Sequence, residues 1–272
     1  MPDTRISELV RIWIDGWVVS RGSSDPIDEP WGWTIDVGQP KHVARHVLPE
    51  PSEGDVRKIV AATSAPGTWL KLFAEEQAVL PWVGPGWRCD SPGFLMSCHL
   101  VPRQAAFAPS RHPARTLAAP AESPRTSSTR ASGRHTESTH RTPLLDGQTL
   151  PDAALVPVRP EVPAGYTLTS WTRGGVSRVL VRTRAGHFAA RGQVAQVGAH
   201  AMVDQVETAV EHRRKGLGGL VMRTLQSTAY EAGARTGLLV GTPEGRALYS
   251  SLGWTMRSPM TSLWYEPSEA AQ

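Results

Sequence analysis

The sequence predicts an α/β protein, and three stretches in the second half of its 272 residues indicate this. Residues 202–208 contain β-branched residues with polar residues between them, which is the pattern of a half-buried strand. From Leu217 onward, apolar residues recur at helical spacing. A second strand at 236–240 leads into Thr242-Pro243-Glu244, a hydroxyl N-cap followed by proline and an acid. This alternation of strands and helices predicts a sheet covered by helices.

The first hundred residues predict further elements of both kinds. Ile6 to Val19 carries an apolar stripe at helical spacing, and Ser52 can start a second helix that runs to about Thr63. The expected strands are Trp31–Val37, Val43–Leu48, Thr68–Phe73 and Phe94–Leu100. Seven of the ten tryptophans lie here, and core filling is their usual role; lining a pocket between two halves is the alternative.

The two halves of the chain show a faint internal repeat. Thr68 and a later Gly86-Trp87 pair parallel Thr236 and Gly253-Trp254, at offsets of 168 and 167. A duplication explains this agreement, although chance competes with it in a tryptophan-rich chain. The first copy has no R-x-x-G-x-G loop, and Pro81 would break its short helix. We therefore expect residues 1–101 to be a degenerate half used for shape.

Between the halves, residues 102–159 have the composition of a disordered linker. Ser, Thr, Pro, Ala and Arg dominate, and no apolar period survives. The net charge of +4 comes from this segment, because Pro102 to Pro143 holds seven arginines against two glutamates. A solvated tether is the favoured interpretation over a nucleic-acid contact, since no aromatic residues that could stack on bases interleave the arginines.

The second half, residues 160–272, begins with strands joined by glycine turns. The expected strands are Tyr166–Trp171, Ser177–Thr183 and His187–Val197. They lead directly into the strand at 202–208.

The loop after residue 208 has the composition of an anion-binding turn. It reads Arg213-x-x-Gly216-x-Gly218, with Gly219 next. The first N–H groups of a helix have no internal partner, and the helix dipole adds positive potential there. The glycines lack a Cβ that would hold a large ligand away, while Arg214 and Lys215 add charge. A pyrophosphate fits this site; an ordinary helix start beside a solvated basic face is the alternative.

With the short helix Ala247-Leu248-Tyr249-x-x-Leu252-Gly253-Trp254, these stretches resemble the GNAT acetyltransferase superfamily. The resemblance covers about 177–266, about a third of the chain. It implies the fold of that superfamily, a central mixed and largely antiparallel sheet flanked by helices, here in tandem with the degenerate first half. Between Trp171 and Ser177 there is no room for the two helices that the superfamily usually inserts. Either that wall of the acceptor site is missing or the first half supplies it.

The resemblance also implies roles for individual residues. Acetyl-CoA is the implied co-substrate, and Tyr249 holds the phenol that protonates the departing thiolate. Backbone groups of the strand end and the loop would hold the cofactor. These cofactor-binding positions are Val206, Thr208, Arg213, Arg214, Lys215, Gly216, Leu217, Gly218, Gly219 and Thr242. Val210 and Thr242 depart from the pattern, which often has proline and asparagine there.

Transfer to an amine also needs a base. An amine with a pKa near 10.4 is neutral in only about one part in 2,500 at pH 7. Glu207 and Asp204 are the candidates, with Glu207 preferred. Three positions apart, they face opposite sides of an unbroken strand, which a bulge would change. Tyr249 could otherwise be an ordinary core aromatic.

The composition of the chain also limits which classes of site and partner are possible. Cys89 and Cys98 are too few for a metal site or a disulfide framework, so we expect reduced core residues and no metal. No apolar run is long enough to cross a membrane, so we expect a cytoplasmic protein, monomeric or homodimeric, without membrane or nucleic-acid partners. The sequence therefore predicts an N-acetyltransferase that acts on a small-molecule or protein amine. A non-catalytic acyl-CoA-binding or regulatory module is the alternative.

Overall fold

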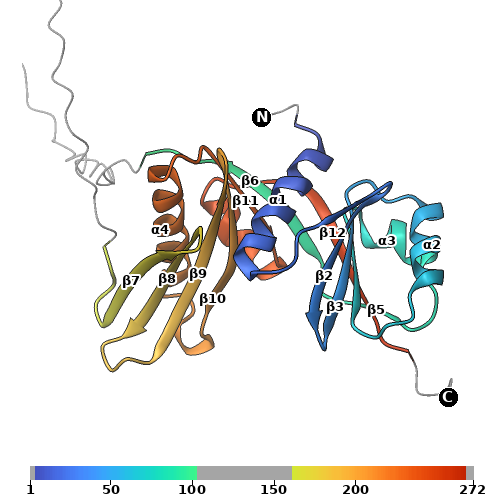
Figure 1. Cartoon of the computed structure of the whole chain (residues 1–272). Helices are drawn as coiled ribbons and strands as arrows, with labels where there is room; N and C mark the ends of the chain where they lie inside the picture. Colours follow the sequence, from blue (N-terminus) through green and yellow to red (C-terminus); the bar gives the residue numbers. More distant parts are fainter. Residues whose placement is uncertain (1–3, 103–160, 268–272) are drawn as a thin grey trace, which may run out of the picture. The chain divides into compact units, whose positions relative to one another are not determined.

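Figure 1 shows the computed structural model, which describes residues 4–102 and 161–267. These two ranges belong to one compact unit. The predicted linker lies outside the described residues apart from its first position, and the boundaries 1–101, 102–159 and 160–272 remain a prediction. No helix in the described ranges is both long and apolar enough to span a bilayer.

The second half contains the predicted elements, one further strand and a short 3₁₀ helix. They are β7 (Tyr166–Arg173), β8 (Val176–Thr183), β9 (Phe188–Val197), β10 (His200–Thr208), η2 (Val210–His212), α4 (Leu217–Glu231), β11 (Thr236–Gly241), α5 (Pro243–Ser251) and β12 (Thr255–Tyr265). Thr242 caps α5, because its hydroxyl accepts the amide hydrogen of Gly245 at 3.2 Å. The sequence pattern does not delimit β12, since Pro259 within it argues against a strand in the middle of a sheet.

The first half contains the predicted elements and several shorter ones. They are α1 (Ile6–Arg21), β1 (Ile27–Glu29), β2 (Gly32–Gln39), β3 (His42–Leu48), α2 (Glu53–Ala62), β4 (Thr68–Leu72), α3 (Glu76–Val79), η1 (Leu80–Trp82), β5 (Trp87–Cys89) and β6 (Gly93–His99). Pro81 lies just beyond α3, which it ends as expected. Both cysteines are free; Cys98 is buried as expected, whereas Cys89 is exposed because β5 is a short strand at the surface.

The strands form a mixed, mostly antiparallel sheet, as predicted. Their order is β1-β2-β3-β4-β12-β6-β11-β10-β9-β8-β7, with β5 paired to β12. Only β3 with β4 and β10 with β11 run parallel among the described pairs, and a helix connects each of these two pairs. The remaining pairs are antiparallel.

The two halves exchange their last strands. β6 of the first half pairs with β11, and β12 of the second half pairs with β4. β12 pairs with β6 through residues 255–260 and with β4 from Thr261 onward, so it belongs to both sheet regions. Pro259 lies at this change of partner, where a missing N–H is tolerated.

The internal repeat is visible in this arrangement. Thr68 opens β4 and Thr236 opens β11, and each of these strands runs parallel to the strand before it and antiparallel to the other half's last strand. A duplication followed by exchange of the final strands accounts for this symmetry.

Helix α1 covers the face of β9, β10 and β11 that α4 leaves open. Met202 and Leu238 of these strands pack with Leu9 and Ile14 of α1, while Ala201 and Val203, one residue away on the opposite face, pack with α4. The helix reaches the sheet closely because Gly16 has no Cβ, which would collide with the Cβ of Met202. The first half therefore covers this face of β9, β10 and β11.

Candidate active site

Two diverging strands open a cleft in the second half. β10 and β11 pair at only three positions, the last being Met202 with Leu238. Beyond this point the strands separate and line a cleft of about 1100 Å³, together with the loop before α4 and one side of α5. Residues from Val203 to Thr208 form one wall, and residues from Leu239 to Gly241 form the other. The unpaired edge of β10 is thus open to an extended ligand.

A β-bulge in β10 brings both candidate carboxylates to one face. Asp204 pairs with Gln193 and Glu207 pairs with Arg191, so two residues of β10 stand opposite Gly192. Gln205, within the bulge, has a φ of 53°, in the left-handed region. Because residues 191 and 193 share a face of β9, Asp204 and Glu207 share it as well. The bulge that the sequence analysis required for this arrangement is present.

The start of α4 offers free amide hydrogens to the cleft. Gly216, the N-cap, has a φ of 76°, and no atom lies within 4 Å of the position a Cβ would take. Its carbonyl accepts the first helical bond, from the amide of Leu220 at 3.0 Å. Within the described residues, the amides from Arg214 to Gly219 have no hydrogen-bond acceptor. Amides without an acceptor at a helix start, next to an open glycine, are suited to an anion.

The predicted cofactor positions surround these amides. Arg213, Arg214 and Lys215 are exposed, and the Lys215 ammonium donates to the Glu211 carbonyl at 2.9 Å. Leu217 is buried, so only its backbone can face a ligand. A Cβ on Gly218 would lie 2.9 Å from Leu248 and 3.6 Å from the Thr208 hydroxyl, so this glycine lets the helix start fit between β10 and α5.

Tyr249 lies in the cleft wall with its ring against two glycines. A Cβ on Gly241 or Gly245 would stand 2.7 or 2.8 Å from a ring carbon of Tyr249. Burial, and secondarily the negative charge of Asp204, raises the pKa of Tyr249 to about 12. The phenol therefore keeps its proton throughout the physiological pH range.

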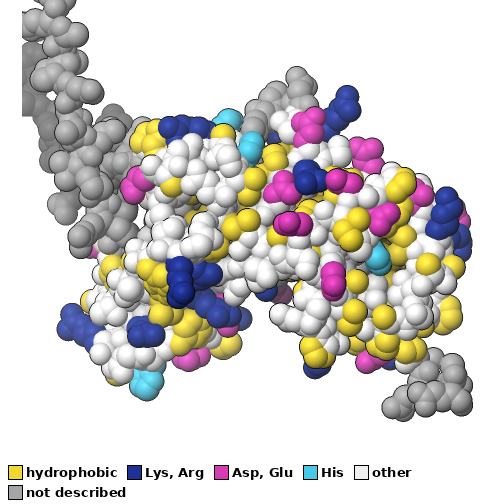
Figure 2. All heavy atoms as spheres, viewed as in Figure 1, with side chains coloured by type: hydrophobic (Ala, Val, Ile, Leu, Met, Phe, Trp, Pro, Cys, Tyr) yellow, Lys and Arg dark blue, Asp and Glu magenta, His cyan; other side chains and the backbone are white. Residues whose placement is uncertain are grey.

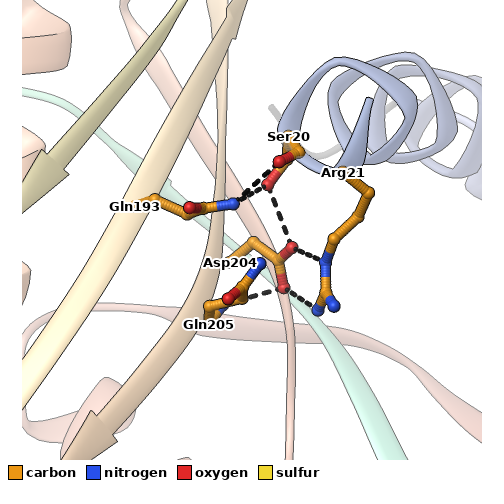
Figure 3. Close-up of polar contacts among 5 residues, drawn as sticks. All are labelled: Ser20, Arg21, Gln193, Asp204 and Gln205. Carbon is orange, nitrogen blue, oxygen red and sulfur yellow. Dashed lines mark hydrogen bonds and ion pairs between the residues drawn. The ribbon is translucent and has the colours of Figure 1, made fainter. Parts of the chain in front are cut away.

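Asp204 is held by four donors from both halves of the chain (Figure 3). Arg21 donates through Nε at 2.6 Å and Nη2 at 3.0 Å, Ser20 donates its hydroxyl at 3.0 Å, and the Gln205 amide donates at 2.8 Å. Gln193 in turn donates to the carbonyl and hydroxyl oxygens of Ser20 at 2.9 and 2.6 Å. The carboxylate connects the end of α1 to the bulge, and its four hydrogen bonds leave it few lone pairs for a further donor.

Glu207 is the more available carboxylate. Its side chain is 51% exposed, and Arg191 bonds one of its two oxygens, at 2.8 and 2.9 Å. It lines the cleft on the same face as Asp204. Among the described residues no cluster of His, Cys, Asp and Glu could hold a metal ion.

Sequence reasoning did not identify Ser20, Arg21, Arg191 or Gln193 as part of the site. The chain separates Arg21 from Asp204 by 183 residues, so no local spacing signals the contact. Gln193 is a buried amide beside the apolar Val194 and Ala195, and that is the one signal that could have marked it.

Three solved structures resemble this chain over most of its length. A GCN5-related N-acetyltransferase from Kribbella flavida matches with a TM-score of 0.57 at 16% identity, covering 98% of this chain and 97% of that one. An acetyltransferase assigned to the GNAT family from Novosphingobium aromaticivorans matches with a TM-score of 0.49 at 15% identity, covering 98% and 100%. A tandem GNAT protein from the clavulanic acid biosynthesis pathway matches with a TM-score of 0.43 at 15% identity, covering 78% and 68%.

No protein-family model matches the chain, and no curated protein is similar to it in sequence. The Kribbella flavida structure, with the strand order and the cleft described above, shows that the chain has the GNAT fold. This confirms the fold that the two sequence motifs predict.

Proposed function

We propose that the chain is an N-acetyltransferase that moves an acetyl group from acetyl-CoA directly to an amine. The observation that carries the proposal is the cleft between β10 and β11, which joins free amides at the start of α4 to the buried phenol of Tyr249. One end of such a cleft suits a diphosphate, and the other suits a reacting group that must be shielded from water.

The residues of the cleft fit acetyl-CoA. The amides from Arg214 to Gly219 would hold the pyrophosphate, and Arg213, Arg214 and Lys215 would add cationic charge. The open edge of β10 near Val206 and Thr208 would bond the pantetheine arm as another strand would. Thr242 lines the cleft beside them, although its hydroxyl already caps α5. When bound, the cofactor would supply a thioester carbonyl as the electrophile.

Two proton movements fall to residues of this chain. A proton has to leave the amine nitrogen, and Glu207 is the carboxylate we assign to receive it, through water. A proton has to reach the departing sulfur, and the neutral Tyr249 hydroxyl is the group we assign to donate it. A backbone N–H of the bulged strand would polarise the carbonyl. Asp204 fixes the bulge and so positions these groups.

Thiol release from acetyl-CoA, measured against a panel of amines, polyamines, amino acids and aminoglycosides, tests the proposal. Replacing Tyr249 with Phe should lower turnover at least about 10-fold and leave the affinity for coenzyme A unchanged. Leu248→Met, a neighbouring change that keeps the volume of the side chain, is the matched control.

The alternative is a non-catalytic acyl-CoA-binding or regulatory module. One observation favours it: Asp204, one of the two candidate bases, already accepts four hydrogen bonds. In that case coenzyme A binds, no amine accelerates thiol release, and Tyr249→Phe changes nothing measurable.

A further inference from the structure

Three neighbouring strands place two basic side chains, Arg45 and Lys71, on the face of the sheet that carries α1. In the β3–β4 ladder Arg45 lies opposite Trp69, and in the β4–β12 ladder Trp69 lies opposite Trp264. Two positions further along, Lys71 lies opposite Ser262. Residues directly opposite each other share a face, so Arg45 and Lys71 point the same way. The Arg45 guanidinium sits 4.1 Å from the ring centre of Trp17 on α1, which identifies the face.

Arg45 has no acceptor for its hydrogen bonds. Within the described residues its guanidinium makes no hydrogen bond and no ion pair, and its Nε is buried without a partner. Burial lowers the pKa of Arg45 to about 10, so it remains cationic at neutral pH. Contact with Trp17 offsets part of the desolvation but supplies no acceptor for the planar set of N–H donors. A guanidinium with this geometry pairs most strongly with a carboxylate or a phosphate.

Lys71 adds a second buried donor beside it. Its ammonium donates to the Ser262 hydroxyl at 2.9 Å and lies 4.2 Å from the ring centre of Trp69. No described carboxylate lies within ion-pair distance of it, and Asp90 acts on it only from further away. His42, stacked on Trp69 at 4.9 Å, has a buried Nδ1 that also has no partner. A buried cation without a counter-ion is costly, and among the described residues Arg45 is such a cation.

A chain of contacts connects the cluster to the cleft. Asp204 lines the cleft and accepts two hydrogen bonds from Arg21. The guanidinium groups of Arg21 and Arg45 lie 5.9 and 4.1 Å from the ring centre of Trp17. Arg21 forms two hydrogen bonds to Asp204, and among the described residues Asp204 makes no ion pair with Arg45. An acceptor that extends from the cleft past Arg21 would therefore meet Arg45 beside Trp17.

We propose that Arg45, supported by Lys71, binds an oxyanion of the acceptor, so that the acceptor is an amine that also carries a carboxylate or a phosphate group. This inference rests on the proposed function for its location, but the oxyanion site can be measured without any acyl transfer.

The first experiment is an equilibrium titration of the full chain with acetate and with inorganic phosphate at constant ionic strength. Tryptophan fluorescence is the readout, because Trp17 contacts Arg45 and Trp69 contacts Lys71. We expect saturable binding in the wild type and in Arg184→Gln, an exposed control on the turn after β8. Arg45→Gln should weaken binding about 10- to 100-fold, and Arg45→Lys should weaken it less. No saturation in the wild type, or equal binding by Arg45→Gln, overturns the proposal.

The second experiment compares acetyl transfer to amines that differ only in the acid group. Amino acids are paired with their amides, and phosphoethanolamine is paired with ethanolamine. The acidic member of at least one pair should have the higher kcat/KM, by about 10-fold or more, and Arg45→Gln should abolish the preference. The pair that responds distinguishes a carboxylate from a phosphate.

The outcomes separate the two proposals. Transfer to neutral amines with no preference in any pair overturns the oxyanion site and leaves the acetyltransferase proposal standing. Arg45-dependent oxyanion binding without transfer to any amine overturns the acetyltransferase proposal and leaves the oxyanion site standing.

Discussion

Replacing Lys71 with Met should change how the stability of the protein depends on pH. Lys71 is 7% exposed, and burial, with a smaller contribution from the charge of Arg45, lowers its pKa from 10.5 to about 7. Above pH 10.5 the amine is neutral in the folded and unfolded states alike. As the pH falls from 10.5 to 7, the unfolded chain takes up a proton that the folded chain does not, so the free energy of unfolding decreases.

The pKa shift sets the magnitude. Each pKa unit corresponds to 1.36 kcal/mol, so a shift from 10.5 to about 7 gives a loss of at most about 5 kcal/mol over that range. Below pH 7 the folded protein binds the proton too, and the contribution levels off. Met fills a similar volume without a titratable group, so Lys71→Met should lose this slope and be more stable than the wild type near pH 7.

Urea unfolding at several pH values between 6 and 10.5, followed by tryptophan fluorescence, measures the effect. The difference in unfolding free energy between Lys71→Met and the wild type should shrink as the pH rises from 7 to 10.5. Lys58→Met is the control, because the Lys58 side chain is 82% exposed and should not alter the slope. Parallel pH profiles for the wild type and Lys71→Met would refute the assignment of a buried, uncompensated amine.

Three further predictions concern α1 and the bulge. Gly16→Ala should lower the unfolding free energy by about 1 to 3 kcal/mol, because the new methyl group meets the Cβ of Met202 and pushes α1 away from β10. Gly54→Ala is the control, because the space around Gly54 is open, and equal melting temperatures for the two variants would contradict this prediction. Asp204→Ala should cost about 2 to 3 kcal/mol in urea unfolding, discounted because Arg21 is 41% exposed, and Arg21→Lys should retain more stability than Arg21→Met. Gln205→Gly should leave stability unchanged or raise it by up to about 1 kcal/mol, since glycine adopts a φ of 53° without strain; a large loss in thermal unfolding would show that the Gln205 side chain stabilises the bulge.

Local sequence patterns predicted the elements that local physics determines. The hydroxyl caps at Ser52 and Thr242 start α2 and α5, and the glycine loop at 213–219 starts α4. These features depend on residues within one or two turns of each other, so they can be read directly from the chain. β1, α3 and β5 were too short to show any periodicity.

Contacts between distant residues were beyond that kind of reasoning. An apolar strand such as β6 is compatible with any neighbouring edge, so its pairing with β11 is set by the whole fold. The contact between Arg21 and Asp204 follows from the placement of α1 on β10, and the unpaired Arg45 follows from the pairing of β3 with β4. The bulge was anticipated only as a condition for Glu207 and Asp204 to share a face.

The central claim is that the start of α4 binds the pyrophosphate of coenzyme A. Isothermal titration calorimetry with coenzyme A tests it most directly, with the wild type, the test variant Gly216→Val and the control Arg184→Gln. The amides from Arg214 to Gly219 are free, and Gly216 has a φ of 76° that valine cannot adopt without strain. We predict saturable binding of coenzyme A by the wild type and by Arg184→Gln, and a loss of at least about 10-fold in affinity in Gly216→Val, which keeps its fold by circular dichroism. Absence of binding by the folded wild type, or equal affinity in Gly216→Val, would contradict the account.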